Sequence, residues 1–182
     1  YKGMPVIVGG DRGIAVAMSP EAKKLGVTRG MPVFKIKKLY PEVVILEHHF
    51  DLYKKIAAKL REILSSYFCE VEVYSIDECF ADITGLDTEL GLSYEEIATQ
   101  VKRTLFDELG ITFSVGLATT KILAKVASKH KKPNGLTIIP SSEIEKYLHE
   151  TSLGKIWGIG PQTSNFLFGL GVQSAWDFAH KN

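Results

Sequence analysis

Apolar residues recur along the chain with two different periods, one typical of helices and the other of strands. In residues 50–67 they fall every three or four positions, at Leu52, Ile56, Leu60, Ile63 and Leu64. This spacing puts them on one face and predicts a long amphipathic helix. A second amphipathic helix is predicted after the capping box formed by Ser93 and Glu96, and it should end at Gly110.

Two segments between these helices have the composition of strands. Residues 71–75 and 79–84 are rich in β-branched and aromatic side chains. Asp77 and Glu78 lie between them, and acidic residues are poorly suited to a strand. The pattern therefore predicts a hairpin whose turn falls at residues 76–78.

The N-terminal part predicts short elements. Two strands are expected within residues 4–18, followed by a helix that Ser19 caps, that Pro20 begins and that Gly26 closes. A second short helix or irregular segment should follow residues 31–32, and a short strand should occupy residues 43–46.

The chain after Gly110 continues with a strand at residues 111–117 and a helix that begins at Thr119 or Thr120 and ends near His130. Its apolar residues, Ile122, Leu123 and Val126, should pack while its lysines stay in water. A strand at residues 136–139 follows, and then short helices at 143–149, 162–169 and 174–179. This order predicts an α+β fold, with helices on one face of a palm-like antiparallel sheet.

Composition narrows the possible classes of protein. The chain has 182 residues, of which 45% are hydrophobic, so it can bury a core of one large or two smaller domains. No apolar run approaches bilayer length and no signal segment opens the chain, so we expect no membrane partner and a cytoplasmic location. The two cysteines and five histidines lack metal-ligand spacing.

Positive charge is concentrated in one segment and is not a property of the whole chain. The net charge is only +1, but Lys121, Lys125 and Lys129 recur at four-residue spacing. They form either a solvated helix face or a surface that faces DNA phosphates, and the spacing fits both.

Asp77 and Glu78 are the strongest candidates for chemistry. Consecutive side chains of a flat strand point to opposite faces, so both carboxylates can share one ligand only where the chain reverses. Two carboxylates held together repel unless a proton or cation lies between them, and hard oxygen ligands favour Mg²⁺ shared with a phosphate. The alternative is an acidic pair that only solvates the turn, which is the commoner role of such a pair.

Several motifs in register resemble the Y-family translesion DNA polymerases. They are YSIDECF at 74–80, SVGLATTKILAKVAS at 114–128, KPNG at 132–135, VGGDRG at 8–13, EAKKLGV at 21–27 and GMP at 30–32. The resemblance extends over essentially the whole chain. It implies a small fingers domain at residues 1–48, a palm at 49–139 and a partial helical thumb at 140–182.

The resemblance implies that the protein is the core of a DNA-directed DNA polymerase that copies damaged templates. Asp77 and Glu78 would be catalytic and would hold two Mg²⁺ ions for nucleotidyl transfer to a primer 3′-hydroxyl. Lys132 matches the lysine that contacts the triphosphate. The chain departs from the family pattern in the fingers, where Pro20 and Lys23 replace a tyrosine and an arginine. Lys23 keeps a positive charge for the nucleotide but not the planar geometry.

The last module, IWGIG at 156–160 with LGV at 170–172, resembles a helix-hairpin-helix. Glycines let the backbone approach DNA closely, and amides at a helix start can bind a phosphate without reading sequence. Gly158, Gly160 and, on the lysine-rich helix, Lys125 are the candidate DNA-binding residues.

The resemblance also implies parts that this chain lacks. The family's first palm strand, with a further metal-binding aspartate, and its little-finger domain are not represented, so we expect this chain alone not to extend a primer. The expected partners are primer-template DNA, deoxynucleoside triphosphates and a sliding clamp bound through the missing C-terminal region. The alternative is a catalytically idle relative that serves as a DNA-binding or adaptor subunit of a mutagenesis complex.

Overall fold

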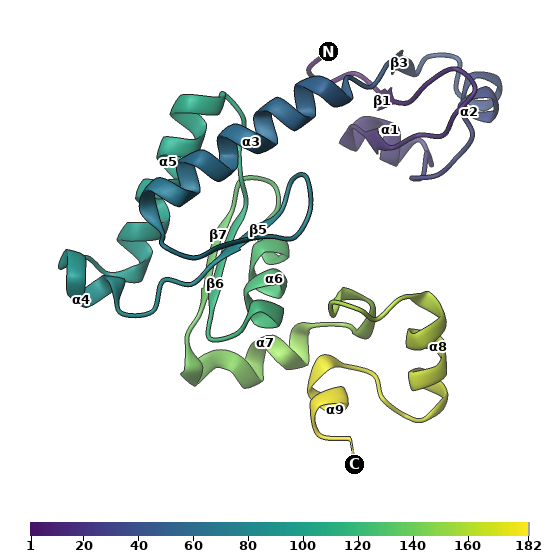
Figure 1. Ribbon diagram of the computed structural model, residues 1–182. Coiled ribbons are helices and arrows are strands. Elements are labelled where there is room, and N and C mark those ends of the chain that lie inside the picture. Colours follow the sequence, from purple (N-terminus) through teal and green to yellow (C-terminus); the bar gives the residue numbers. More distant parts are fainter. Residues whose placement is uncertain (182) are drawn as a thin grey trace. The chain divides into compact units, whose positions relative to one another are not determined.

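The computed structural model describes residues 1–181 as two compact units, Tyr1–Lys55 and the chain from Ile56 onward (Figure 1). Both units mix helices with short strands. No helix in the described residues is both long enough and apolar enough to span a membrane.

The N-terminal unit is built around a three-stranded sheet in the order β2-β1-β3. Its elements are β1 (Val6–Val8), β2 (Ala17–Met18), α1 (Pro20–Lys24), α2 (Val33–Leu39) and β3 (Val44–Leu46). Strand β1 pairs with β2 in antiparallel and with β3 in parallel orientation. Ser19 caps α1 as predicted, since its side chain accepts a hydrogen bond from the Ala22 amide at 3.2 Å.

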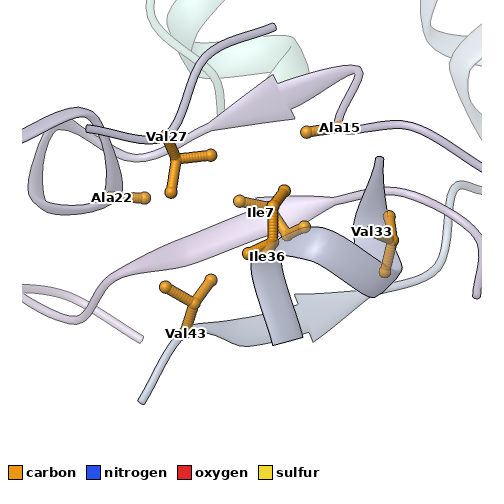
Figure 2. Packing of buried hydrophobic residues seen from close by; sticks show 7 residues of the cluster. All are labelled: Ile7, Ala15, Ala22, Val27, Val33, Ile36 and Val43. Carbon is orange, nitrogen blue, oxygen red and sulfur yellow. The ribbon is translucent and has the colours of Figure 1, made fainter. Parts of the chain in front are cut away.

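Small and β-branched side chains form the core of this unit. Figure 2 shows them converging from strand β1, from helices α1 and α2 and from the segments that connect the elements: Ile7, Ala15, Ala22, Val27, Val33, Ile36 and Val43. The side chains of Ile7 and Ile36 are fully buried. The short elements are therefore held by one shared apolar cluster, because helices of five to seven residues are not stable alone.

The second unit begins with two long helices that pack with a hairpin. Its first elements are α3 (Phe50–Tyr67, which starts in the first unit), β4 (Val71–Val73), β5 (Cys79–Ala81), α4 (Leu86–Leu90) and α5 (Tyr94–Leu109). Leu60 and Ile63 of α3 join Val101 and Leu105 of α5 in one buried cluster, against which β4 and β5 pack. The Tyr67 hydroxyl also bonds that of Thr104 at 2.7 Å. The core thus lies beneath the acidic hairpin and supports it.

The second unit continues with a strand–helix–strand motif of β6 (Val115–Ala118), α6 (Lys121–His130) and β7 (Leu136–Ile139). Helix α6 packs against both strands (Figure 1). Gly116 allows the close approach, because a Cβ there would lie 2.1 Å from the Ala124 carbonyl oxygen and 2.3 Å from the Ser128 amide nitrogen. The close packing of α6 on the strands therefore requires a glycine at position 116.

Short helices form the rest of the chain. They are two 3₁₀ turns, η1 (Ser141–Glu143) and η2 (Leu153–Lys155), and the α-helices α7 (Ile144–Glu150), α8 (Pro161–Gly169) and α9 (Ala175–Ala179). Ser174 and Asp177 form a capping box at the start of α9. A bridge between Ser152 and Ser174 ties this helix back to the region of η2.

The predicted α+β class is confirmed, but the sheet differs from the prediction of one antiparallel sheet. In the described residues the ladders form separate small sheets, and only β4–β5 in the second unit is antiparallel. Strands β6 and β7 are parallel, because α6 carries the chain back to the starting edge before the second strand begins. The boundary between the two units falls inside α3, and the assignment of fingers, palm and thumb stays a prediction.

Candidate active site

The acidic pair lies at the tip of the β4–β5 hairpin. The Glu78 carbonyl oxygen accepts hydrogen bonds from the amides of Tyr74 and Ser75, both at 3.0 Å, and these bonds close the loop. Asp77 is exposed and Glu78 is half-buried. The turn predicted at residues 76–78 is therefore present, and it brings the two carboxylates to one end of the hairpin.

Ser75 orients one of these carboxylates. Its hydroxyl donates a hydrogen bond to Asp77 Oδ1 at 2.7 Å. The Asp77 amide lies 3.5 Å from the same hydroxyl oxygen, which is too long for a strong bond. Ser75 thus supports the conformation of the turn and leaves the other oxygen of Asp77 free of this bond.

Lys125 reaches the second carboxylate from α6. Its Nζ lies 3.1 Å from Glu78 Oε2, and only 10% of its side chain is exposed, against 38% for Glu78. The expectation that the lysines of this helix stay in water is therefore wrong for Lys125. Lys121, one turn earlier, forms an ion pair with Glu72 of β4, so two lysines at i and i+4 tie α6 to the hairpin.

Burial of Lys125 is made possible by two aromatic rings. The ammonium lies 3.9 Å from the centre of the Tyr74 ring and 4.9 Å from that of the Trp157 ring. Each such contact stabilises a cation by about 0.5–2 kcal/mol. Trp157 Nε1 in turn donates a hydrogen bond to the Tyr74 hydroxyl at 2.8 Å. The negative faces of two rings and one carboxylate thus surround this positive charge.

Trp157 also packs directly on the hairpin. Its ring stacks on Phe80 of β5, with 5.6 Å between centroids and 19° between planes, and meets the Tyr74 ring edge-on at 4.7 Å. Sequence reasoning did not identify Tyr74 and Trp157 as site residues. The two are 83 positions apart, and the only local signal is a large amphipathic ring beside an acidic turn and another beside a glycine turn.

Two titratable groups on the hairpin have shifted pKa values. The Thr84 hydroxyl and amide donate to Asp82 Oδ1 at 2.6 and 2.9 Å, which lowers the pKa of that carboxyl below its usual value. Partial burial raises the pKa of the Cys79 thiol, and the nearby charge of Arg61 opposes this only in part. Cys79 therefore stays a neutral thiol and is unsuited to act as a nucleophile.

The donor set fits a magnesium site that is completed by other ligands. Asp77 and Glu78 offer hard carboxylate oxygens at adjacent positions. No cluster of three or more histidine, cysteine or acidic side chains in residues 1–181 is placed to hold a metal. Mg²⁺ commonly binds one or two carboxylates and takes its remaining ligands from water and substrate phosphates. The hairpin offers two oxygen donors of this kind.

The other candidate residues lie on separate elements. Lys132 is exposed and follows α6, next to a turn in which Lys102 bonds the Asn134 side chain. Gly158 has φ +91°, a conformation that side chains disfavour, and Gly160 directly precedes α8. Lys23 is exposed on α1 in the N-terminal unit. Of the predicted site residues, the structure brings together Asp77, Glu78 and Lys125.

Comparison with known proteins places this arrangement in a family. Residues 1–129 match the impB/mucB/samB family. DNA polymerase IV of Clostridioides difficile (strain 630) is 39% identical over 179 residues, which are 97% of this chain and 49% of the relative. DNA polymerase IV of Desulfatibacillum aliphaticivorans is 40% identical over 178 residues, 97% of this chain and 45% of the relative. The chain therefore spans about half the length of these relatives.

Solved structures give the same result. The crystal structure of DinB from Sulfolobus solfataricus superposes with a TM-score of 0.86 at 32% identity, over 100% of this chain and 54% of that one. The insertion ternary complex of Dbh DNA polymerase gives a TM-score of 0.86 at 32% identity, over 100% of this chain and 55% of that one. The chain thus belongs to the impB/mucB/samB family, that is, to the Y-family DNA polymerases that its motifs resemble.

Proposed function

We propose that the protein provides the catalytic hairpin of a DNA-directed DNA polymerase for translesion synthesis. The observation that carries the proposal is the pair Asp77 and Glu78 at the hairpin tip, with Ser75 bonded to the first and Lys125 to the second. Two carboxylates held at one end of a hairpin suit phosphoryl transfer, which depends on positioning and charge stabilisation more than on a protein nucleophile.

Asp77 and Glu78 would hold two Mg²⁺ ions together with phosphate and water ligands. When bound, these ions would activate a primer 3′-hydroxyl and neutralise the charge that develops on the leaving pyrophosphate. The chain's own residues set the geometry. Ser75 fixes the rotamer of Asp77, and Lys125 holds one oxygen of Glu78, so that each carboxylate starts from a defined position.

Lys132 would bind the triphosphate of the incoming nucleotide and Lys23 would add positive charge from the N-terminal unit. Both side chains are exposed, as this role requires. Gly158 and Gly160 would let backbone amides near the start of α8 contact a DNA phosphate. Support for DNA and a nucleotide as ligands comes from a similar solved structure that is an insertion ternary complex of a DNA polymerase. The sliding clamp stays a prediction.

The test is primer extension in Mg²⁺ by the complete polypeptide that the gene encodes, since the relatives are about twice as long as this chain. We expect Asp77→Asn and Glu78→Gln to lower the rate of nucleotide incorporation by about 100-fold or more, because each would remove a charged oxygen ligand of the metal ions that stabilise the transition state. Glu95→Gln, an exposed glutamate on α5, is the matched control and should retain the wild-type rate.

Equal incorporation by the wild-type protein and both site variants would refute the assigned roles. A wild-type protein that binds primer-template DNA but incorporates nothing would instead support the adaptor alternative. The experiment therefore separates the enzyme from a catalytically idle relative.

A further inference from the structure

Trp157 lies between two features that the proposed function uses separately. It directly precedes Gly158 in the loop of the predicted helix-hairpin-helix, hereafter the glycine loop (residues 156–160). Its ring is also packed on the acidic hairpin, stacked on Phe80 and bonded through Nε1 to the Tyr74 hydroxyl. A shift of the glycine loop must therefore move a ring that contacts the hairpin.

The contacts of Trp157 extend through Lys125 to the Glu78 carboxylate. Tyr74 and Trp157 both hold the Lys125 ammonium, at 3.9 and 4.9 Å from their ring centres, and the ammonium holds Glu78 Oε2 at 3.1 Å. Lys125 is nearly buried, so its charge cannot turn to water without leaving the rings. The path from Trp157 to Glu78 is thus an unbroken series of direct contacts.

We propose that Trp157 is a positioning residue, which acts through Tyr74 and Lys125 and links the glycine loop to the orientation of the Glu78 carboxylate. The inference rests on the proposed function in one respect, namely that Glu78 takes a divalent cation and the glycine loop takes a DNA backbone. Binding at either place then changes the affinity of the other by the same factor, since such coupling is reciprocal.

A spectroscopic experiment tests the path without any polymerase reaction. The 182-residue polypeptide contains two tryptophans, so Trp176→Phe in this polypeptide leaves Trp157 as its single fluorescent reporter. Titration of this variant with Mg²⁺ alone, without DNA or nucleotide, should give a saturable change in the emission of Trp157. The change should be lost in Glu78→Gln and in Lys125→Met, while Lys125→Arg, which keeps the charge and the ring contacts, should retain it.

The control is Lys129→Met, which removes an exposed lysine one turn further along α6 and should leave the signal intact. Circular dichroism of each variant shows whether it is folded. An unchanged Mg²⁺ response in a folded Lys125→Met protein would overturn the proposed path. So would the absence of any response in the Trp176→Phe protein at Mg²⁺ concentrations that bind the hairpin.

The link to DNA is measured separately, by electron paramagnetic resonance of Mn²⁺ as the bound cation. Primer-template DNA should shift the Mn²⁺ dissociation constant by a larger factor in the wild-type protein than in Lys125→Met. Equal factors in the two proteins would overturn the link between the glycine loop and Glu78. A failure of the proposed function would be seen in a different experiment, as nucleotide incorporation that is insensitive to Asp77→Asn. The failure of this inference and the failure of the proposed function are therefore distinguishable.

Discussion

Gly116 controls how closely α6 lies over its strands, and its replacement by alanine is the sharpest structural test. The added Cβ would lie 2.1 Å from the Ala124 carbonyl oxygen, 2.3 Å from the Ser128 amide nitrogen and 2.9 Å from the Ala127 carbonyl carbon. All three atoms belong to the backbone of α6, so no side chain can rotate aside. The helix would have to retreat from β6.

The size of the effect follows from these distances. Non-bonded heavy atoms pack at about 3.5–4.0 Å, so α6 must withdraw by about 1 Å or more. Its buried residues Leu123, Val126 and Ala127 would then lose contact with the strands. Overpacking in a core costs about 1–3 kcal/mol. We expect Gly116→Ala to lower the free energy of unfolding by about 3 kcal/mol, near the upper end of this range, because the obstructing backbone atoms cannot rotate aside.

Urea unfolding followed by tryptophan fluorescence measures this loss, since both tryptophans lie in the second unit. With an m-value of about 2 kcal/mol/M, the midpoint should fall by about 1.5 M. The control is Gly169→Ala at the end of α8, where no atom lies within 4 Å of the added Cβ. That variant should be as stable as the wild type or slightly more stable. Equal midpoints for the two variants would refute the packing derived for α6.

Further predictions concern single groups. Exposed Cys69 should react with iodoacetamide faster than Cys79, whose pKa is raised by burial, and denaturant should make the two rates equal. Ser93→Ala should lower the free energy of unfolding by about 1 kcal/mol, measured by urea titration, because it removes the capping box of α5. The pKa of Asp82 is lower in the folded protein than its ordinary value of 3.8. The ionised Asp82 therefore stabilises the fold at pH values above 3.8, and this stabilisation is lost as the pH falls through the pKa of the folded state. Thr84→Val, without the hydroxyl donor, should therefore lose less stability on acidification than the wild type, and equal losses would contradict this cause.

Sequence reasoning succeeded where local signals determine the structure. The helical period of residues 50–67 coincides with α3, and the capping box of Ser93 and Glu96 starts α5 as predicted. Both depend on residues within a few positions of one another. The reversal at Asp77 and Glu78 was also predictable, because adjacent carboxylates are unfavourable within a strand.

Sequence reasoning failed where contacts between distant segments determine the structure. Parallel pairing of β6 with β7 depends on the path of α6 between them, which strand composition does not reveal. Ile122 was expected to pack but is 50% exposed, whereas Lys125 was expected in water but is buried. Lysines at four-residue spacing are typical of a solvated face. Only the tertiary fold brings Tyr74 and Trp157 to Lys125, so no local pattern could predict its burial.

The most direct test of the acidic hairpin as a metal site is Mn²⁺ binding to the complete polypeptide, measured by electron paramagnetic resonance with primer-template DNA and a non-hydrolysable deoxynucleoside triphosphate. The wild-type protein and Glu95→Gln should bind Mn²⁺ with the same affinity. Asp77→Asn and Glu78→Gln should each weaken binding by about tenfold or more, because each removes a charged oxygen ligand. Unchanged Mn²⁺ affinity in both variants would show that the two carboxylates do not hold the metal.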